Sequence, residues 1–112
     1  MTFEPWDVVV VPFPFTDKKA SKRRPALVLS AARHFNTGHT VLAMITSRGN
    51  AAWSLDVPIT DATAAGLTTP SVVRMKLFTL DDRLILRKLG ALSDKDATAV
   101  ATALKKLFFK NL

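Results

Sequence analysis

An arginine pair and a distant threonine are the residues of this chain best suited to chemistry. Arg23 and Arg24 stand directly before Pro25, and an apolar run over residues 26–30 follows. A residue that precedes proline is steered into extended geometry, so Arg24 is expected to project from stiff backbone where a strand begins. A planar guanidinium held in this way suits bidentate recognition of phosphate. Thr46, at the end of another apolar run, adds a hydroxyl, and we expect the two groups to converge on one phosphodiester.

The net charge of the chain favours a polyanionic partner. Its 112 residues include 16 Lys and Arg against 9 Asp and Glu, which gives a formal net charge of +7. Five of these cations lie within residues 18–24. Such clustering favours nucleic acid first and an acidic protein second, whereas the alternative is a basic protein that is merely well solvated.

Several classes of protein are not expected from the composition. The chain has no cysteine, which removes disulfides, thiolate catalysis and Cys-based metal sites. His34 and His39 lie five residues apart in a polar connection, and we interpret both as loop residues rather than catalytic groups or metal ligands. No cofactor or metal is expected. The amino terminus lacks the pattern of a signal peptide, and no apolar segment approaches the ~18 residues of a membrane span.

The elements that must position these residues are short strands followed by one helix. Alternating or continuous apolar runs with turn residues between them predict strands, which are listed here: 7–15, 26–30, 40–46, 53–59, 71–75, 77–80 and, less regularly, 83–89. Val8 to Val11 are expected to be buried on both faces. Trp53 could stack on a base, but it fits the core face of its strand, so core packing is the role we expect for it. One helical turn is expected around residues 62–65. The chain is long enough for one domain, residues 1–112.

The carboxyl-terminal helix is indicated most clearly. Ser93 is a suitable N-cap, and Asp94 and Asp96 in the first turn complement the helix dipole. Apolar residues from Ala97 to Phe108 then follow helical spacing. We therefore expect a mainly β protein with a C-terminal helix, built as a small barrel of five to seven short strands.

Six segments of the chain, taken in order, resemble the MazF/PemK family of toxins. They are residues 7–13, 23–30, 45–47, 70–74, 79–84 and 90–93, and the similarity runs from about Asp7 to Phe108. Each motif alone is weak, but six at plausible spacing are specific. Residues 13–17, Phe-Pro-Phe-Thr-Asp, resemble a sub-branch of PemK-like proteins.

The resemblance implies a fold, an activity and partners. Members of the family have SH3-like barrels of the CcdB/MazF type with a terminal helix, and form homodimers. Many are metal-independent endoribonucleases that cut single-stranded RNA in the bacterial cytoplasm. Each is usually paired with an antitoxin whose acidic, flexible segment covers the RNA groove. By this similarity Arg24 and Thr46 match the catalytic arginine and threonine, and Ser47 matches the polar residue that follows.

Cleavage of this kind needs only a few protein groups around the phosphodiester. The 2′-hydroxyl attacks the adjacent phosphorus, which leaves a 2′,3′-cyclic phosphate and a 5′-hydroxyl. We assign Arg24 mainly to stabilising the charge on the phosphorane, with proton donation to the leaving oxygen left open. Thr46 would hold a phosphate oxygen through its hydroxyl.

Further residues are expected to bind RNA. Lys22, Arg23 and Arg48 are expected to contact phosphates or acidic antitoxin side chains, and the alternative for each is simple solvation. Phe13 and Phe15 stand beside the basic loop and have base stacking as one of their open roles.

Two other functions remain alternatives. A catalytically inactive relative would bind RNA or an acidic partner without cutting. A gyrase poison is the third hypothesis, since CcdB shares this barrel, although the Arg-Pro and Ile-Thr-Ser motifs argue against it.

Overall fold

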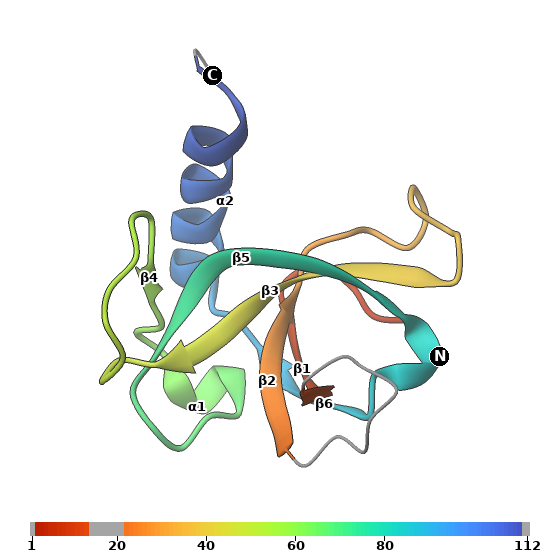
Figure 1. Ribbon diagram of the computed structural model, residues 1–112, viewed down its shortest axis with the longest axis horizontal. Coiled ribbons are helices and arrows are strands. Elements are labelled where there is room, and N and C mark those ends of the chain that lie inside the picture. The colour runs from red at the N-terminus through yellow and green to blue at the C-terminus, as the bar shows by residue number, and fades with distance from the viewer. Residues whose placement is uncertain (1, 14–21, 111–112) are drawn as a thin grey trace.

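The computed structural model describes residues 2–13 and 22–110, which are built around one curled antiparallel sheet (Figure 1). Its strands are β1 (Asp7–Phe13), β2 (Lys22–Val28), β3 (His39–Ser47), β4 (Val57–Pro58), β5 (Ser71–Asp81) and β6 (Arg87–Ala91). They lie in the order β4-β5-β3-β2-β1-β6, and the sheet bends into a half-barrel. The predicted mainly β fold with a C-terminal helix is confirmed.

Strand β1 is buried on both faces, as the sequence predicts. Val8, Val9, Val10 and Val11 are each no more than 8% exposed. Val8 packs in a core with residues of the helices, whereas Val9 and Val11 pack in a second core on the other face. Burial on both faces fixes the register of β1, because a slip by one residue would exchange the two sets of side chains.

The second strand begins four residues earlier than predicted and includes the Arg-Arg-Pro motif. Pro25 lies opposite Val10 of β1, whereas pairing with β3 covers only Ala26 to Val28. Proline lacks an N–H group, and it is tolerated here because one side of β2 has no ladder at this position. Another departure is β5, which is continuous where two strands were predicted. A register shift in its pairing with β3, between Ala43 and Met44, accommodates the extra residues.

The prediction of a strand over residues 53–59 was wrong, because only Val57 and Pro58 form β4. Residues 53–56 form a turn in which the Asp56 N–H donates to the Trp53 carbonyl. Trp53 is 47% exposed and does not pack in the core. The alternation of apolar residues was misleading because Leu55, inside the turn, also packs against the core.

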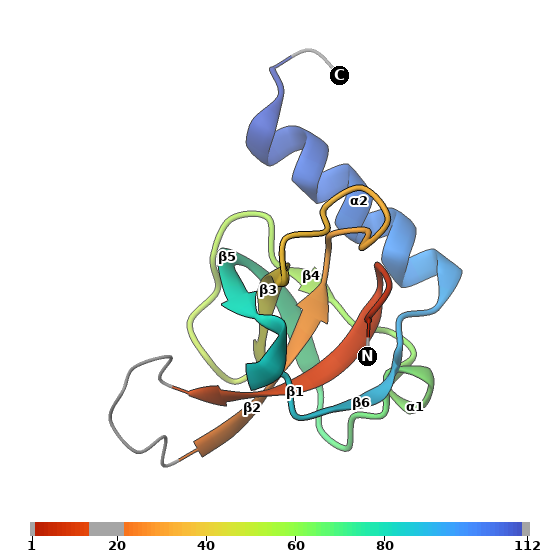
Figure 2. The same ribbon diagram turned by 90° about the vertical axis from the view of Figure 1, so that its right-hand side faces the viewer.

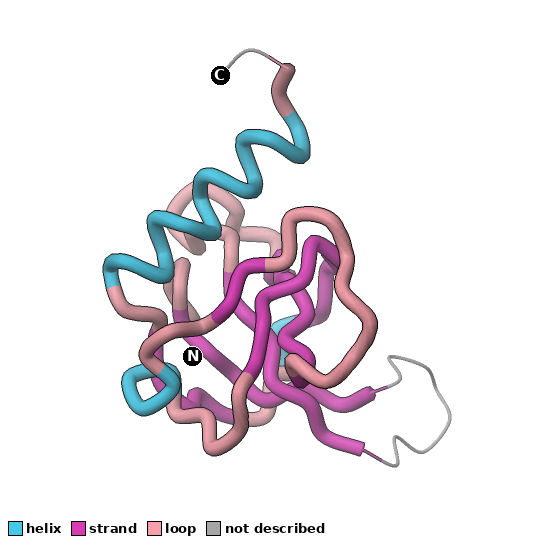
Figure 3. The backbone as a smooth tube through the Cα atoms, turned by 90° about the vertical axis from the view of Figure 1, so that its left-hand side faces the viewer, coloured by secondary structure: helices cyan, strands magenta, loops and turns pink. Residues whose placement is uncertain are grey.

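Three helical segments complete the fold. These are α1 (Ala62–Ala65), the 3₁₀ turn η1 (Asp82–Leu84) and α2 (Asp94–Phe108). Ser93 caps α2 as predicted, since its hydroxyl accepts the Asp96 N–H at 3.2 Å. The last turns of α2 extend beyond the sheet (Figures 1 and 3). Within residues 2–13 and 22–110, no helix has the length and apolar character needed to cross a membrane.

Asp96 joins the first turn of α2 to the segment between β4 and α1. Its carboxylate accepts the Thr60 hydroxyl at 2.7 Å and the Thr60 and Asp61 N–H groups at 3.0 Å each. Burial alone would raise the pKa of Asp96, but these hydrogen bonds together hold that pKa below its ordinary value. The charged carboxylate is therefore the form that the fold stabilises.

A contact between two glycines holds α1 against β6. Gly66 ends α1 with φ of 73°, a conformation that side-chain-bearing residues rarely adopt. A β-carbon on Gly66 would overlap the backbone of Leu89, and one on Gly90 would overlap the backbone of residues 64–66. This approach of two backbones fixes the start of the loop, residues 67–70, that leads into β5.

We expect the Asp96→Asn variant to lose about 1–3 kcal/mol of unfolding free energy at neutral pH, because an amide cannot accept three hydrogen bonds as a carboxylate does. The folded-state pKa of Asp96 is lowered, so its contribution is present above the unfolded pKa of about 3.9 and is lost as pH falls through the folded value. The difference between wild type and variant should therefore shrink in acid.

Urea denaturation at neutral pH and below about pH 4 would measure both quantities. Asp94→Asn is the matched control, since Asp94 is an exposed acid of the same helical turn. An equal loss in the two variants, or a difference that grows in acid, would contradict the role assigned to Asp96.

Candidate functional site

Arg24 lies in the part of β2 that pairs with β1 alone. It stands opposite Val11, in the hairpin that β1 and β2 form and that points away from α2 (Figure 2). Its guanidinium carbon lies 5.6 Å from the centre of the Phe13 ring, a distance typical of a cation–π contact. The described residues place no carboxylate in an ion pair with Arg24. The half-buried guanidinium thus keeps its hydrogen-bond donors available for an anion.

Thr46 lies one residue before the end of β3, and its hydroxyl is oriented by a neighbour. The Asn50 side-chain amide donates to Thr46 Oγ1 at 2.6 Å. Because this oxygen already accepts a hydrogen bond, the hydroxyl proton is free to point elsewhere as a donor. The side chain of Thr46 is only partly buried, so this donor can reach a bound phosphate.

The register of β2 and β3 places Arg24 and Thr46 on one face at one edge. The last pair in this ladder is Ala26 with Met44, and each functional residue lies two positions further along its own strand. Side chains two residues apart in a strand share a face. Beyond that pair β2 and β3 are no longer hydrogen-bonded to each other, so Arg24 and Thr46 lie on the same face just past the end of their shared ladder.

A cavity of about 330 Å³ adjoins the start of β2. Three arginines from two strands line it, together with hydroxyls of the loop before β5: Arg23, Arg24, Arg87, Thr68, Thr69 and Ser71. No carboxylate of residues 2–13 or 22–110 lines it. Arginines with no carboxylate beside them in the lining, together with Thr68 and Thr69, make a cationic hollow suited to a phosphate or another anion.

The cavity connects the two functional strands. Ser71, on its wall, pairs with Ser47 at the end of β3. The Arg48 N–H donates to the carbonyl of Pro70 at 3.1 Å, which joins the turn after β3 to the loop that forms the wall. The loop wall of the cavity is therefore attached to the end of β3, although Thr46 itself does not line the cavity.

The remaining predicted RNA-binding residues are only partly grouped with Arg24. Lys22 and Arg23 are exposed neighbours of Arg24 in β2. Ser47 and Arg48 are exposed beside Thr46, where the Ser47 hydroxyl accepts the Gly49 N–H at 3.3 Å. Phe13 contacts Arg24. Phe15 lies outside the described residues, and so does most of the Phe-Pro-Phe-Thr-Asp segment, so the sub-branch stays a prediction.

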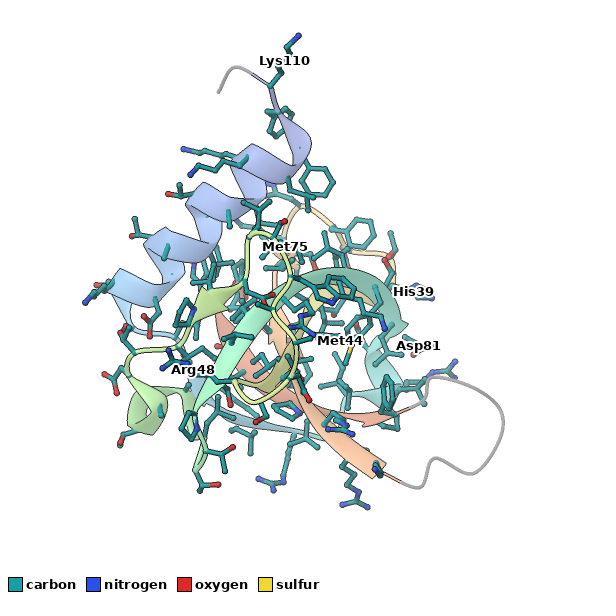
Figure 4. All side chains as sticks on the ribbon, turned by 60° about the vertical axis from the view of Figure 1, so that its left-hand side comes forward. His39, Met44, Arg48, Met75, Asp81 and Lys110 are labelled. Carbon is teal, nitrogen blue, oxygen red and sulfur yellow. The ribbon has the colours of Figure 1, made fainter. Side chains whose placement is uncertain are left out.

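Neither histidine belongs to this site. His39 begins β3 and lies far from Arg48 and close to Asp81 (Figure 4). At about 3.3 Å per residue, the seven steps from His39 to Thr46 span roughly 23 Å of strand. His34 is exposed in the loop before β3. Among the described residues, His, Asp and Glu side chains form no group of three that could hold a metal ion.

Several residues of the site were missed from the sequence. Asn50 was assigned to a turn, although its amide orients Thr46. Arg87, Thr69 and Ser71 come from segments that the chain order separates widely from Arg24. Only Ser71 lay in a recognised motif, and nothing in local spacing indicates that the loop before β5 lies across from the Arg-Pro motif.

Comparison with known proteins now gives this geometry a context. A family model described as PemK-like, MazF-like toxin of type II toxin-antitoxin system matches residues 4–108. The comparison with curated protein sequences found no match.

Solved structures show the same fold at low identity. Toxin MazF-mt6 of Mycobacterium tuberculosis is 22% identical, with a TM-score of 0.74 over 95% of this chain and 99% of that one. A MazE-MazF structure from Deinococcus radiodurans is 23% identical, with a TM-score of 0.74 over 99% of both chains. An endoribonuclease in complex with its cognate antitoxin, from a mycobacterial species, is 18% identical, with a TM-score of 0.69 over 93% of this chain and 90% of that one.

The family match covers nearly the whole chain, and the six-stranded curled sheet with its terminal helix agrees with it. The chain belongs to the PemK-like, MazF-like family of toxins of type II toxin-antitoxin systems.

Proposed function

We propose that this toxin is an endoribonuclease that cuts single-stranded RNA without a metal ion and leaves a 2′,3′-cyclic phosphate and a 5′-hydroxyl. The observation that carries the proposal is the register that sets Arg24 and Thr46 on one face, just past the last residue pair of β2 and β3. Family membership supports it, since one structural relative is named an endoribonuclease. Because the proposed substrate is cellular RNA, we expect the toxin to act in the bacterial cytoplasm.

The reaction needs alignment and charge stabilisation. The 2′-hydroxyl loses its proton and attacks phosphorus, the bond from phosphorus to the 5′ oxygen breaks, and that oxygen takes up a proton. The Arg24 guanidinium donates to the non-bridging oxygens as their charge grows, since it has no carboxylate partner among the described residues. The Thr46 hydroxyl, oriented by Asn50, donates to a phosphate oxygen and helps align the scissile group.

The cationic cavity binds the phosphates that flank the scissile one. Arg23 and Arg87 line it on the β-strand side, and Thr68 and Thr69 on the loop side, where the Ser71 hydroxyl donates to the Thr69 carbonyl at 2.9 Å. Such contacts hold the strand in register without reading its sequence. The same cations attract the acidic segment of a cognate antitoxin, which would block RNA by occupying the site. A homologue crystallised with its cognate antitoxin supports this partner.

We also propose that the toxin is a homodimer that covers its main apolar groove. The groove, of about 280 Å³, lies between the C-terminal half of α2 and strands β3 and β5, and is lined mainly by Leu29, Val41, Leu77, Leu104, Phe108 and Phe109. Phe108 is 60% exposed and Phe109 54%. Large apolar side chains grouped in this way favour burial against a second surface, and a second copy brings the same apolar groove.

The Arg24→Ala variant should cut RNA at least about 100-fold more slowly than wild type, because one oriented donor to the developing charge is lost. Arg24→Lys should recover only part of the rate, since an ammonium cannot bind two oxygens in parallel. The assay uses a long single-stranded RNA in excess chelator, with fragment ends identified by mass spectrometry.

The matched control is Arg33→Ala, which removes the same charge from an exposed position in the loop before β3. Wild-type protein that binds RNA but never cuts it would support the inactive-relative alternative. Inhibition of DNA supercoiling without RNA cleavage would support the gyrase-poison alternative.

The Arg87→Ala variant should weaken binding of all single-stranded RNA sequences alike, because Arg87 contacts a phosphate in this proposal. The slope of log K against log salt should become shallower by about 0.7, the value for one phosphate contact on a single strand. Fluorescence anisotropy at several salt concentrations would measure it, with Arg33→Ala as control. An unchanged slope would remove Arg87 from the RNA path.

Replacing Phe108 with Asp should convert a dimer of this 12.3 kDa chain into a monomer, because the carboxylate would be buried unpaired in the interface. Sedimentation equilibrium would give the mass. Leu86→Asp is the control, since Leu86 is 45% exposed outside the groove. A wild-type monomer, or equal dissociation of both variants, would contradict the proposed dimer surface.

A further inference from the structure

The exposed indole of Trp53 rests on a buried arginine. The Arg74 guanidinium carbon lies 4.9 Å from the centre of the ring, and the Arg74 side chain is only 11% exposed. Trp53 itself is 47% exposed, so one part of the indole covers the arginine and the rest is open to solvent. The open part of the ring is available to stack on a further planar group.

The arginine beneath the ring is held rigidly. Arg74 Nε donates to Asp56 Oδ1 at 3.1 Å, and Nη2 donates to Asp56 Oδ2 at 2.9 Å and to the Ala51 carbonyl at 2.8 Å. The hydrogen bond from Arg74 lowers the pKa of Asp56, and the bond to Asp56 raises the pKa of Arg74. Both groups are therefore charged throughout the physiological range, and the fork geometry fixes the plane on which the indole lies.

The backbone of Trp53 is fixed as well. Its N–H donates to Asp56 Oδ2 at 2.9 Å, and the turn closes through the Asp56 N–H and the Trp53 carbonyl. Leu55, inside the turn, has a φ of 68°, which is strained for a residue with a side chain, and its packing against the core offsets that strain. The ring is thus preorganised, and a ligand would spend little entropy in ordering it.

This platform adjoins the proposed cleavage site. Arg74 pairs with Met44, two residues from Thr46 and on the same face of β3. Two consecutive residues link the groups, since the Asn50 side chain donates to Thr46 and the Ala51 carbonyl accepts from Arg74. A nucleotide next to a phosphate held at Thr46 is therefore within reach of the Trp53 ring.

We propose that Trp53 is the stacking platform for one unpaired base of the RNA strand, and that it helps determine which sequence is cut. This inference rests on the proposed function. A base is favoured over an acidic side chain because Asp56 already neutralises the local cation, whereas the open face of the indole offers only stacking. Arg74 below the ring draws electron density from the face above, which favours the larger, electron-rich purines over pyrimidines.

The test measures binding without cleavage. The probes are short 2′-O-methyl RNA oligonucleotides, which lack the attacking hydroxyl, and abasic oligonucleotides with the same number of phosphates. Base-bearing strands should quench the tryptophan fluorescence of wild-type protein, purine-rich strands most strongly, and abasic strands should not. The Trp53→Phe variant keeps a smaller ring and should retain most of the affinity, but it should lose the quenching.

The Trp53→Leu variant should bind base-bearing strands about 5- to 150-fold more weakly and abasic strands as tightly as wild type does. Its salt slope should stay unchanged, because no phosphate contact is lost; a variant that was merely distorted near the site would change it. Phe35→Leu is the matched control, since Phe35 is 38% exposed in the loop before β3 and lines none of the proposed site.

The possible results distinguish the stacking role of Trp53 from the endoribonuclease proposal. Equal weakening for base-bearing and abasic strands, or quenching by a polyglutamate peptide but not by RNA, would overturn the stacking role of Trp53. RNA cleavage by wild-type protein without any quenching would overturn it too, while leaving the proposed function intact. Quenching and selective binding without cleavage would support the platform and remove the endoribonuclease proposal.

Discussion

The pairing of β2 with β3 is the constraint on which the arrangement of this molecule depends. Three residue pairs, from Ala26 with Met44 to Val28 with Leu42, set which face each following side chain occupies. A slip of β2 by one residue would turn Arg24 to the opposite face from Thr46 and would move Leu27 out of the core. The hydrophobic cores on both faces of the sheet therefore protect the placement of polar groups that contribute nothing to either core.

The charged side chains of this protein fall into two groups: those that form ion pairs within the molecule and those that do not. Arg74 and Asp56 neutralise each other and form a rigid support, and Lys88 pairs with Asp7 at 3.2 Å across β6 and β1. The arginines around the cavity are left without such partners among the described residues. An anion that reaches the cavity thus does not have to displace an internal carboxylate, and most of the Coulomb attraction goes into binding.

The sequence predicts much of the fold because its signals there are local. Ser93 and the acidic residues after it identify the start of α2, and the valines of β1 indicate burial on both faces. The strand predicted over residues 53–59 failed because alternation of residue types cannot distinguish a strand from a turn in which one apolar side chain, Leu55, packs against the core. Trp53 was placed in the core for the same reason, since its partner Arg74 lies 21 residues away and no local pattern reveals that contact.

The candidate site likewise contains some residues that the sequence indicates and others that it does not. Arg24 and Thr46 are recognisable because a proline and a strand end mark them, and the family resemblance depends on those motifs. Asn50 and Arg87 carry no such mark, because their roles follow from a turn geometry and from a ladder with β1. Prediction from one sequence therefore identifies candidate residues that stand in motifs and misses the neighbours that tertiary structure places beside them.

The two glycines that bring α1 against β6 have a consequence for how this toxin can evolve. The loop that they anchor forms one wall of the arginine-lined hollow, so the width of that hollow is set by main chain meeting main chain. Substituting either glycine meets immediate steric conflict, whereas the arginines and hydroxyls around them can be exchanged without moving the wall. Substitutions of lining side chains can therefore change the charge of the cavity in small steps during evolution. The width of the cavity stays the same, because the backbone contact between α1 and β6 sets it.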